Sequence, residues 1–215
     1  PWRSPGHSAY CFAYQGFFDE VALAAERDLL EFRLDLLSRS YGEPPLDLER
    51  TAGTLRVAAE KAGWGRKMAP GRGLGMAFHF DHGGFVSHVV EVSAEGSRIR
   101  VEKVWSGIDV GPVLNLSGAR NQVEGCVVDA LSTAQLEITF EDGAAVQGNF
   151  DDYGLLRIDQ APPDIECHFI QSDFPPMGLG EPPIAPATPA IVNAIYAATG
   201  TRIRELPLSR AGISV

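Results

Sequence analysis

The sequence is poor in cysteine, and its three cysteines, Cys11, Cys126 and Cys167, lie far apart. No pair has the Cys-x-x-Cys spacing that zinc and iron–sulfur sites use, and three isolated thiols do not form a disulfide framework. We interpret all three as buried thiols, because free cysteine is among the most frequently buried residue types.

Long apolar runs and surplus positive charge are also lacking. No run of 18 or more apolar residues occurs, so we expect no membrane span. Because 18 Lys and Arg residues face 28 Asp and Glu residues, the net charge is −10, which argues against nucleic-acid binding. The chain begins at Pro1 without a Met or a secretory signal, so we expect its true start to be missing. The compartment stays open between cytoplasm and periplasm.

What the chain has is enough apolar content, 45% of 215 residues, for a proper core. Residues 1–70 form a helical segment in this interpretation. Helical spacing of apolar residues predicts a helix over 16–38. A second helix is expected from Asp47, a plausible N-cap, to Gly63, a good left-handed stop.

Residues 71–215 have a mixed α+β pattern. We expect a hairpin, a helix capped by Ser117 and ending near residue 136, a second hairpin around the tight-turn pair Asp142-Gly143, and one further strand. The expected strands cover residues 85–92, 99–108, 137–140, 144–150 and 165–170. A last helix should start with Thr188 as its cap and Pro189 at its first position, and end at Gly200. The predicted fold class is α+β, with mostly antiparallel strands and packed helices.

Two short motifs suggest ligands but fit poorly. Gly71 to Gly75 is glycine-rich, yet a phosphate loop needs a preceding strand and a following helix, and β-like sequence follows here. His79 and His82 flank Asp81, but a zinc site needs three or four ligands, and histidines three apart do not share a strand face. We interpret them as a strand histidine and a turn histidine and predict no metal ligands, with a His79/His82 metal enzyme as the weakest alternative.

Arg3, Ser4, Pro5 and Gly6 should form a rigid turn whose backbone amides can face a ligand, although an ordinary surface turn is the simpler interpretation. Gln122 lies early in a predicted helix near Gly125, where an anionic group could approach. That glycine could equally be a packing site between helices. No Gly-x-Ser-x-Gly elbow surrounds a serine, which argues against a serine hydrolase.

Glu181 is the most informative candidate. It stands between Gly180 and Pro182, so it cannot belong to a charged helix face, and the stiff surroundings suit a general base that must be held in place. A solvated loop carboxylate explains the same spacing equally well.

Taken in order, these segments resemble the C-terminal portion of the molybdopterin-binding subunit of the xanthine dehydrogenase and aldehyde oxidase family, especially the isoquinoline 1-oxidoreductase beta type. The resemblance covers essentially residues 1–215. The matching segments are Trp2 to Ser8, Phe18 to Ala22, Ile108 to Gly111, Asn121 to Gly125, Asp152-Tyr153, and Gly180 to Pro183 followed by Ala190 to Gly200.

The resemblance implies the molybdenum-cofactor-binding domain of the xanthine oxidase type. It implies that water supplies the oxygen that hydroxylates an aldehyde or an N-heteroaromatic carbon, with Glu181 as the general base. Gln122 resembles the glutamine that hydrogen-bonds the pterin, and Arg3-Ser4 resembles the turn that approaches the metal, with Gly180 beside the base. Implied cofactors are molybdopterin cytosine dinucleotide and, on a small partner subunit, [2Fe–2S] clusters.

The family's Met-Gly-Gln-Gly segment, its Ser/Thr-rich cofactor loop and its cluster cysteines do not occur in this sequence. We therefore expect a partner that completes the cofactor site, either the remainder of the molybdopterin-binding subunit or a second molybdenum-binding chain. The alternative is a structural or assembly fragment that binds no cofactor alone.

Overall fold

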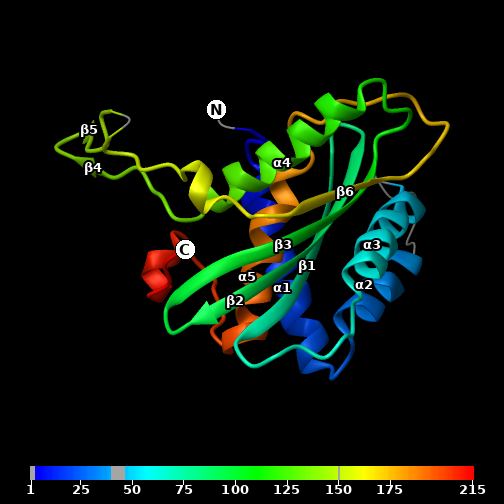
Figure 1. The fold of residues 1–215 in the computed structure, drawn as a ribbon, viewed down its shortest axis with the longest axis horizontal. Coiled ribbons are helices and arrows are strands. Elements are labelled where there is room, and N and C mark those ends of the chain that lie inside the picture. Colours follow the sequence, from blue (N-terminus) through cyan, green and yellow to red (C-terminus); the bar gives the residue numbers. More distant parts are fainter. Residues whose placement is uncertain (1–2, 40–46, 150) are drawn as a thin grey trace.

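The computed structural model describes residues 3–39, 47–149 and 151–215 and shows a twisted sheet with helices on both faces (Figure 1). Trp2 of the first motif and the end of the predicted strand 144–150 lie outside this range. The strand order is β1-β2-β3-β6, in which the first three strands are antiparallel and β6 runs parallel to β3. The strands are β1 (Arg72–Asp81), β2 (Gly84–Glu95), β3 (Arg98–Asp109) and β6 (Ile165–Phe169). The expected α+β class, with mostly antiparallel strands, is confirmed.

Glycines in the strands allow helices to pack closely on both faces. A Cβ at Gly75 would lie 2.1 Å from the backbone nitrogen of Ala194, in α5 (Ile184–Thr199). A Cβ at Gly107 would lie 2.0 Å from the carbonyl oxygen of Thr54, in α3 (Leu48–Ala62). Gly73 and Gly75 therefore belong to a strand that packs against a helix, as the β-like sequence after Gly71 predicts.

Alternate residues of the strands point to opposite faces of the sheet and contribute to two separate hydrophobic clusters, one on each face. Along β1, Leu74, Met76 and Phe78 pack toward α3 and α2 (Leu29–Ser38). The opposite face, which includes Ala77, is covered by α5 and α4 (Leu116–Thr133). Helix α1 (His7–Ala24) packs against α5 and strand β1. This alternation is what a strand that is buried on both sides requires.

The single helix expected over 16–38 is wrong, because the chain forms α1 and α2 with a break between them. Glu26 has a positive φ of 53°, and the Asp28 carboxylate accepts hydrogen bonds from the amides of Leu30 and Glu31. Asp28 followed by Glu31 is a helix-start signal that the continuous apolar spacing hid. The predicted N-cap at Asp47 and the left-handed stop at Gly63 are confirmed for α3.

The boundaries of the later helices also need correction. Helix α4 is capped by the side chain of Asn115, which accepts from the amide of Gly118, so the predicted cap Ser117 is wrong. Helix α5 begins at Ile184, and the Thr188 hydroxyl donates to the Ala130 carbonyl instead of capping a helix. Pro189 therefore lies inside the helix rather than at its first position. The end of α5 at Gly200, with a φ of 76°, is confirmed.

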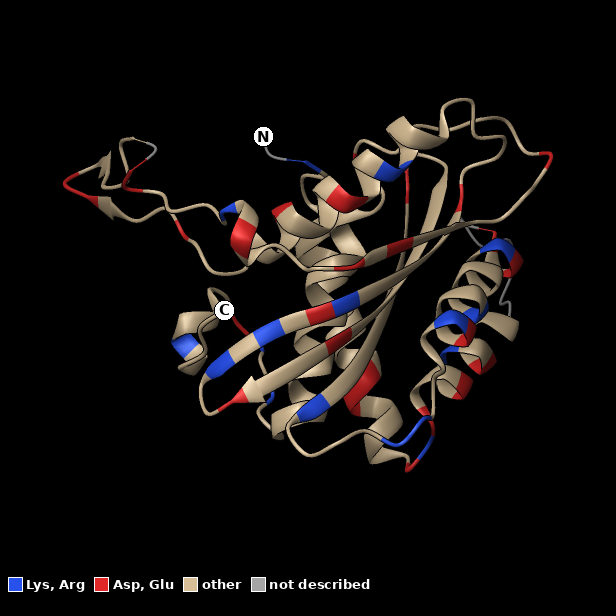
Figure 2. Cartoon of the chain, viewed as in Figure 1, with Lys and Arg blue, Asp and Glu red and all other residues tan. Residues whose placement is uncertain are grey.

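The second predicted hairpin exists but is minimal, with strands β4 (Phe140–Glu141) and β5 (Ala144–Ala145) around Asp142-Gly143. It lies on an arm away from the main sheet (Figure 1). The short 3-10 helices η1 (Ile158–Gln160) and η2 (Leu208–Ala211) complete the elements. Within the described part of the chain, no helix is both long and apolar enough to cross a membrane. Lys and Arg lie interspersed with Asp and Glu in the view of Figure 2.

A buried ion-pair network joins α1, α2 and the segment after α5. The Asp19 carboxylate lies 3.3 Å from Nη2 of Arg33 and 3.0 Å from Nη2 of Arg202. Asp19 and Arg33 are almost completely buried, so each depends on the other for compensation of its charge. The network ties α1 and α2 to the segment that follows α5.

Candidate functional site

Glu181 lies in the loop that leads from β6 into α5, immediately before the helix begins at Ile184. Its side chain is 33% exposed, and its Oε2 lies 2.7 Å from Nε2 of His82, in the turn after β1. The contact engages one carboxylate oxygen. The structure therefore places a partly exposed carboxylate at the start of a helix, in contact with a partly exposed imidazole.

The backbone on both sides of Glu181 is fixed by buried side chains. Nε2 of His88, on β2, donates to the Pro183 carbonyl at 2.8 Å, since a carbonyl can only accept. On the other side, the Cys126 thiol donates to the Gly180 carbonyl at 3.6 Å. A Cβ at Gly84 would lie 3.0 Å from Pro182. Sequence reasoning missed His88, because a lone histidine within an apolar strand carries no sign of its partner.

His88 is completely buried, and burial lowers its pKa from 6.5 to about 4. Its Nδ1 lies 2.9 Å from the Ser106 hydroxyl. Because Nε2 carries the proton for Pro183, Nδ1 of the neutral ring must accept from Ser106. A neutral, doubly hydrogen-bonded ring therefore anchors the loop of Glu181 to the sheet.

The structure brings Arg3, Gln122 and Gly180 together, although they come from the N-terminus, α4 and the loop before α5. Nη2 of Arg3 donates to Oε1 of Gln122 at 2.8 Å, and Nη1 donates to Asp129 at 2.9 Å and to the sulfur of Cys126 at 3.4 Å. Cys126 also contacts Gly180, so it lies between the arginine and the loop of Glu181. Next to Gln122, a cavity of about 440 Å³ is lined mainly by apolar residues from Val110 to Ala119 and from Pro176 to Leu179.

Ser4 points away from this group. It has a positive φ of 51° within the turn before α1, and its hydroxyl donates to Oδ2 of the buried Asp81. The expected turn over residues 3–6 is present, with Gly6 at a φ of 81°. It places Arg3 beside Gln122 and Ser4 beside β1.

The interpretation of His79 as a strand residue and His82 as a turn residue is confirmed, since His82 follows β1 with a φ of 47°. Both nevertheless belong to a polar cluster around Asp81, which His7 completes. Burial, followed by the charge of His7, lowers the pKa of His79 to about 4. The alternation of His79 and Asp81 along one strand could have indicated their shared face, but His7 is 72 residues away from His79.

Cys11 and Cys126 are fully buried, as expected, whereas Cys167 is only partly buried. Burial raises the pKa of Cys126 to about 11, so its thiol stays protonated and can donate to Gly180.

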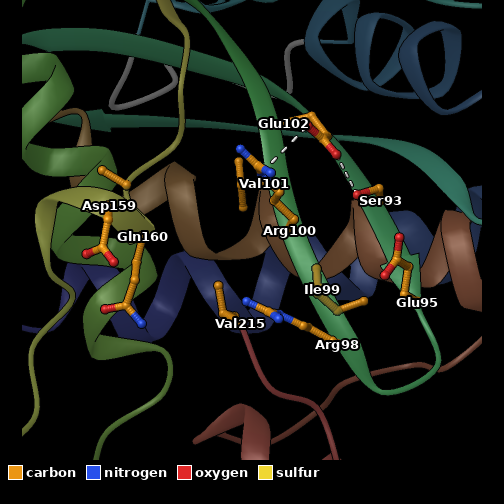
Figure 3. Close-up of a pocket in the computed structure, with 11 residues that line it drawn as sticks. Ser93, Glu95, Arg98, Ile99, Arg100, Val101, Glu102, Asp159, Gln160 and Val215 are labelled. Atoms are coloured by element: carbon orange, nitrogen blue, oxygen red, sulfur yellow. Dashed lines mark hydrogen bonds and ion pairs between the residues drawn. The ribbon is translucent and has the colours of Figure 1, made fainter.

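A different hollow, of about 460 Å³, lies at the tip of the hairpin of β2 and β3 (Figure 3). Three of its polar groups bind one another: Ser93 donates to Glu102 at 2.6 Å, and Arg100 forms an ion pair with the same carboxylate. The hollow lies at the opposite end of β2 from Gly84, against which Pro182 packs, so the candidate site around Glu181 is elsewhere.

Residues 35–162 match the family model described as "Molybdopterin cofactor-binding domain". Two similar curated proteins are "Membrane-bound aldehyde dehydrogenase [pyrroloquinoline-quinone]" from Gluconacetobacter polyoxogenes, 33% identical, and "Isoquinoline 1-oxidoreductase subunit beta" from Brevundimonas diminuta, 31% identical. These matches cover 98% and 97% of this chain but only 29% and 26% of the relatives.

The solved structure of the aldehyde oxidoreductase from Desulfovibrio gigas matches 97% of this chain and 40% of its own chain, with a TM-score of 0.73. At 14% identity, this match shows the fold alone.

Proposed function

From the premise that this chain belongs to the xanthine dehydrogenase and aldehyde oxidase family, through its molybdopterin cofactor-binding domain, we propose that it carries the general base of a molybdenum hydroxylase. The reaction is the oxidation of an aldehyde or an N-heteroaromatic carbon, with water as the source of oxygen. The observation that carries the proposal is Glu181, a partly exposed carboxylate on a loop whose backbone is anchored on both sides.

The residues near Glu181 fit one side of a pterin group. Oε1 of Gln122 is held by Arg3, whereas its Nε2 has no hydrogen-bond partner among the residues that the structure describes. That amide nitrogen is available to donate to a polar heterocycle. Apart from its own chain neighbours, no atom of the described residues lies within 4 Å of the Cβ position of Gly180, so a ligand can approach the backbone there. Gln122 would thus hold the pterin, Arg3 would orient Gln122, and Gly180 would allow close approach.

In this proposal Glu181 accepts a proton during the reaction. When bound, the molybdenum centre supplies a two-electron acceptor and activates water. His82 contacts Oε2, which leaves Oε1 for the proton. Hydrogen bonds from His88 and Cys126 to the carbonyls of Pro183 and Gly180 hold the backbone that carries the carboxylate, which suits a general base that must be positioned.

The cofactor form and the partners are further parts of the proposal. We propose that the cofactor is molybdopterin cytosine dinucleotide. The proposed partners are either the remainder of the molybdopterin-binding subunit or a second molybdenum-binding chain, together with a small subunit that carries [2Fe–2S] clusters. The matches cover only 29% and 26% of the two relatives, and in this proposal the chain supplies one wall of the cofactor site and the partner supplies the rest. One relative's name contains pyrroloquinoline quinone, so cofactor analysis must discriminate between the two groups.

The test is to purify the chain with its co-purifying polypeptides and to measure molybdenum, released nucleotide and quinone. Turnover is then measured with isoquinoline, nicotinate and an aromatic aldehyde in ¹⁸O-labelled water. The proposal expects stoichiometric molybdenum and label in the product. Quinone without molybdenum, or product without label, would contradict it.

The second hypothesis is a structural or assembly fragment without a cofactor of its own, and it rests on the family's cofactor-binding segments that this sequence lacks. Stoichiometric molybdenum on the isolated chain would contradict it, whereas a complex that retains full activity after this chain is removed would favour it.

A further inference from the structure

Asp81 is a buried carboxylate that faces histidines. Its side chain is 1% exposed, and Ser4 donates a hydrogen bond to Oδ2. Oδ1 lies 3.5 Å from Nε2 of His7 and 3.5 Å from Nε2 of His82. In the described ranges 3–39, 47–149 and 151–215, no Lys or Arg forms an ion pair with it. A buried carboxylate is costly without a positive partner, so this location favours a cation.

Tyr14 contacts the neighbouring His79 and orients its ring. Its hydroxyl donates to the Phe78 carbonyl at 3.2 Å and also lies 2.7 Å from Nδ1 of His79. A phenol has only one proton to donate, so both bonds form together only if Nδ1 of His79 is the donor in the second. Nε2 of His79 then carries a lone pair. Metal-binding histidines are held in the same way, with the other ring nitrogen donating to an outer partner.

His7 completes the cluster from the first turn of α1. Its Nδ1 lies 2.9 Å from the lone-pair nitrogen of His79, so one proton is shared between the two rings. The His7 side chain is 46% exposed, which gives a cation from solvent a path to the buried donors. One nitrogen from each histidine and one Asp81 oxygen lie within 4.8 Å of one another.

We propose that His7, His79 and Asp81 bind a divalent transition-metal cation of the zinc type, which takes the place of the proton shared by the two histidines. Two imidazoles and one carboxylate are a ligand set that zinc uses, with the fourth position left to water. Tyr14 and Ser4 form the outer layer that holds His79 and Asp81. The site is independent of the proposed function, because its donors belong to this chain and it needs no molybdenum.

Asp81, His82 and Glu181 form a second group of three donors within the same distance. In this second group, the side chains of His82 and Glu181 are 66% and 33% exposed, whereas Asp81 is buried. In the described structure, no hydroxyl group forms a hydrogen bond with His82 or Glu181. The proposal therefore assigns the cation to the His7 and His79 side of Asp81, and the second group becomes an outcome of the test.

The test titrates Zn²⁺, Co²⁺ and Mg²⁺ into the chelator-treated chain by calorimetry at neutral pH, with the absorption spectrum of bound Co²⁺ as a second readout. We expect one Zn²⁺ per chain, a Co²⁺ spectrum of four-coordinate nitrogen and oxygen ligation, and no Mg²⁺ binding, because Mg²⁺ prefers oxygen ligands in an octahedron. Failure to bind one Zn²⁺ per chain would overturn the proposal, as would a six-coordinate Co²⁺ spectrum.

Variants then locate the cation. His79→Gln and the half-exposed His7→Gln should each abolish stoichiometric binding, with folding checked by circular dichroism. Tyr14→Phe removes no ligand but should weaken binding about 10–100-fold, as loss of an outer partner does. His168→Gln, on β6 and paired with Glu166, is the matched control and should bind normally.

Glu181→Gln should also bind Zn²⁺ normally. If Glu181→Gln abolishes binding and His7→Gln does not, the cation occupies the second group and the assignment is wrong. Unchanged affinity in Tyr14→Phe would equally contradict it. These assays contain no molybdenum, so their failure is distinguishable from failure of the proposed hydroxylase function.

Discussion

Replacing His88 by Leu tests whether this buried histidine anchors the loop of Glu181. The substitution introduces an apolar side chain of similar size and removes the donor to Pro183 and the acceptor for Ser106. Each buried polar group left without a partner costs about 1–3 kcal/mol. We therefore expect the free energy of unfolding to fall by about 3 kcal/mol at pH 7.

The same histidine predicts how this loss changes with pH. Its pKa is 6.5 when solvated and about 4 in the folded chain. Between these pH values His88 binds a proton in the unfolded chain but not in the folded chain. The wild type therefore loses stability as the pH falls from 6.5 to 4. At about 1.4 kcal/mol per pH unit, the loss amounts to about 3 kcal/mol. His88→Leu lacks this loss, so the two stabilities should converge near pH 4.

Urea unfolding of both proteins between pH 7.5 and 4, in the presence of a chelator, measures the difference directly. Other groups that titrate in this range are shared by the two proteins and cancel in the comparison. The control, His168→Leu, removes a partly exposed ring and should change stability by less than about 1 kcal/mol. A difference between wild type and His88→Leu that stays constant with pH would refute the buried neutral histidine.

Two further predictions concern the frame around the site. Asp19→Ala leaves the buried Arg33 without one of its partners and should cost about 3–5 kcal/mol in chemical unfolding, whereas Glu20→Gln in an exposed pair should cost less than about 1 kcal/mol. Equal costs would contradict the buried network. Gly75→Ala should lower the melting temperature, because its Cβ would meet the backbone of α5. Gly148→Ala should not, because no described atom beyond its chain neighbours lies within 4 Å of its Cβ position. A Gly75→Ala variant as stable as the wild type would mean that close packing is not required there.

Local signals determined how much of the fold could be predicted. The first hairpin, the cap at Asp47 and the stops at Gly63 and Gly200 follow from residues within a few positions, and the structure has them. The break between α1 and α2 was missed because apolar spacing runs across it, although Asp28 carries a cap signal. The start of α5 was misplaced because Thr188, a good capping residue, donates instead to a neighbouring helix.

The site was predictable only where a motif marked it. Glu181, Gln122 and Arg3 were chosen from short segments, and the structure brings the last two into direct contact. Their roles toward a cofactor stay predictions. The support provided by His88 and Cys126, and the cluster around Asp81, depend on contacts between distant segments, which leave no local pattern.

The most direct test of the central claim is the turnover number of Glu181→Gln in the molybdenum-loaded complex, compared with wild type and with Glu205→Gln as an exposed control. Molybdenum and nucleotide contents are measured in each preparation, so that loss of cofactor is distinguished from loss of the base. We predict unchanged cofactor and a turnover number lower by about 100-fold or more, because loss of a general base has this effect. Near-normal turnover with full cofactor would contradict the assignment of Glu181 as the base.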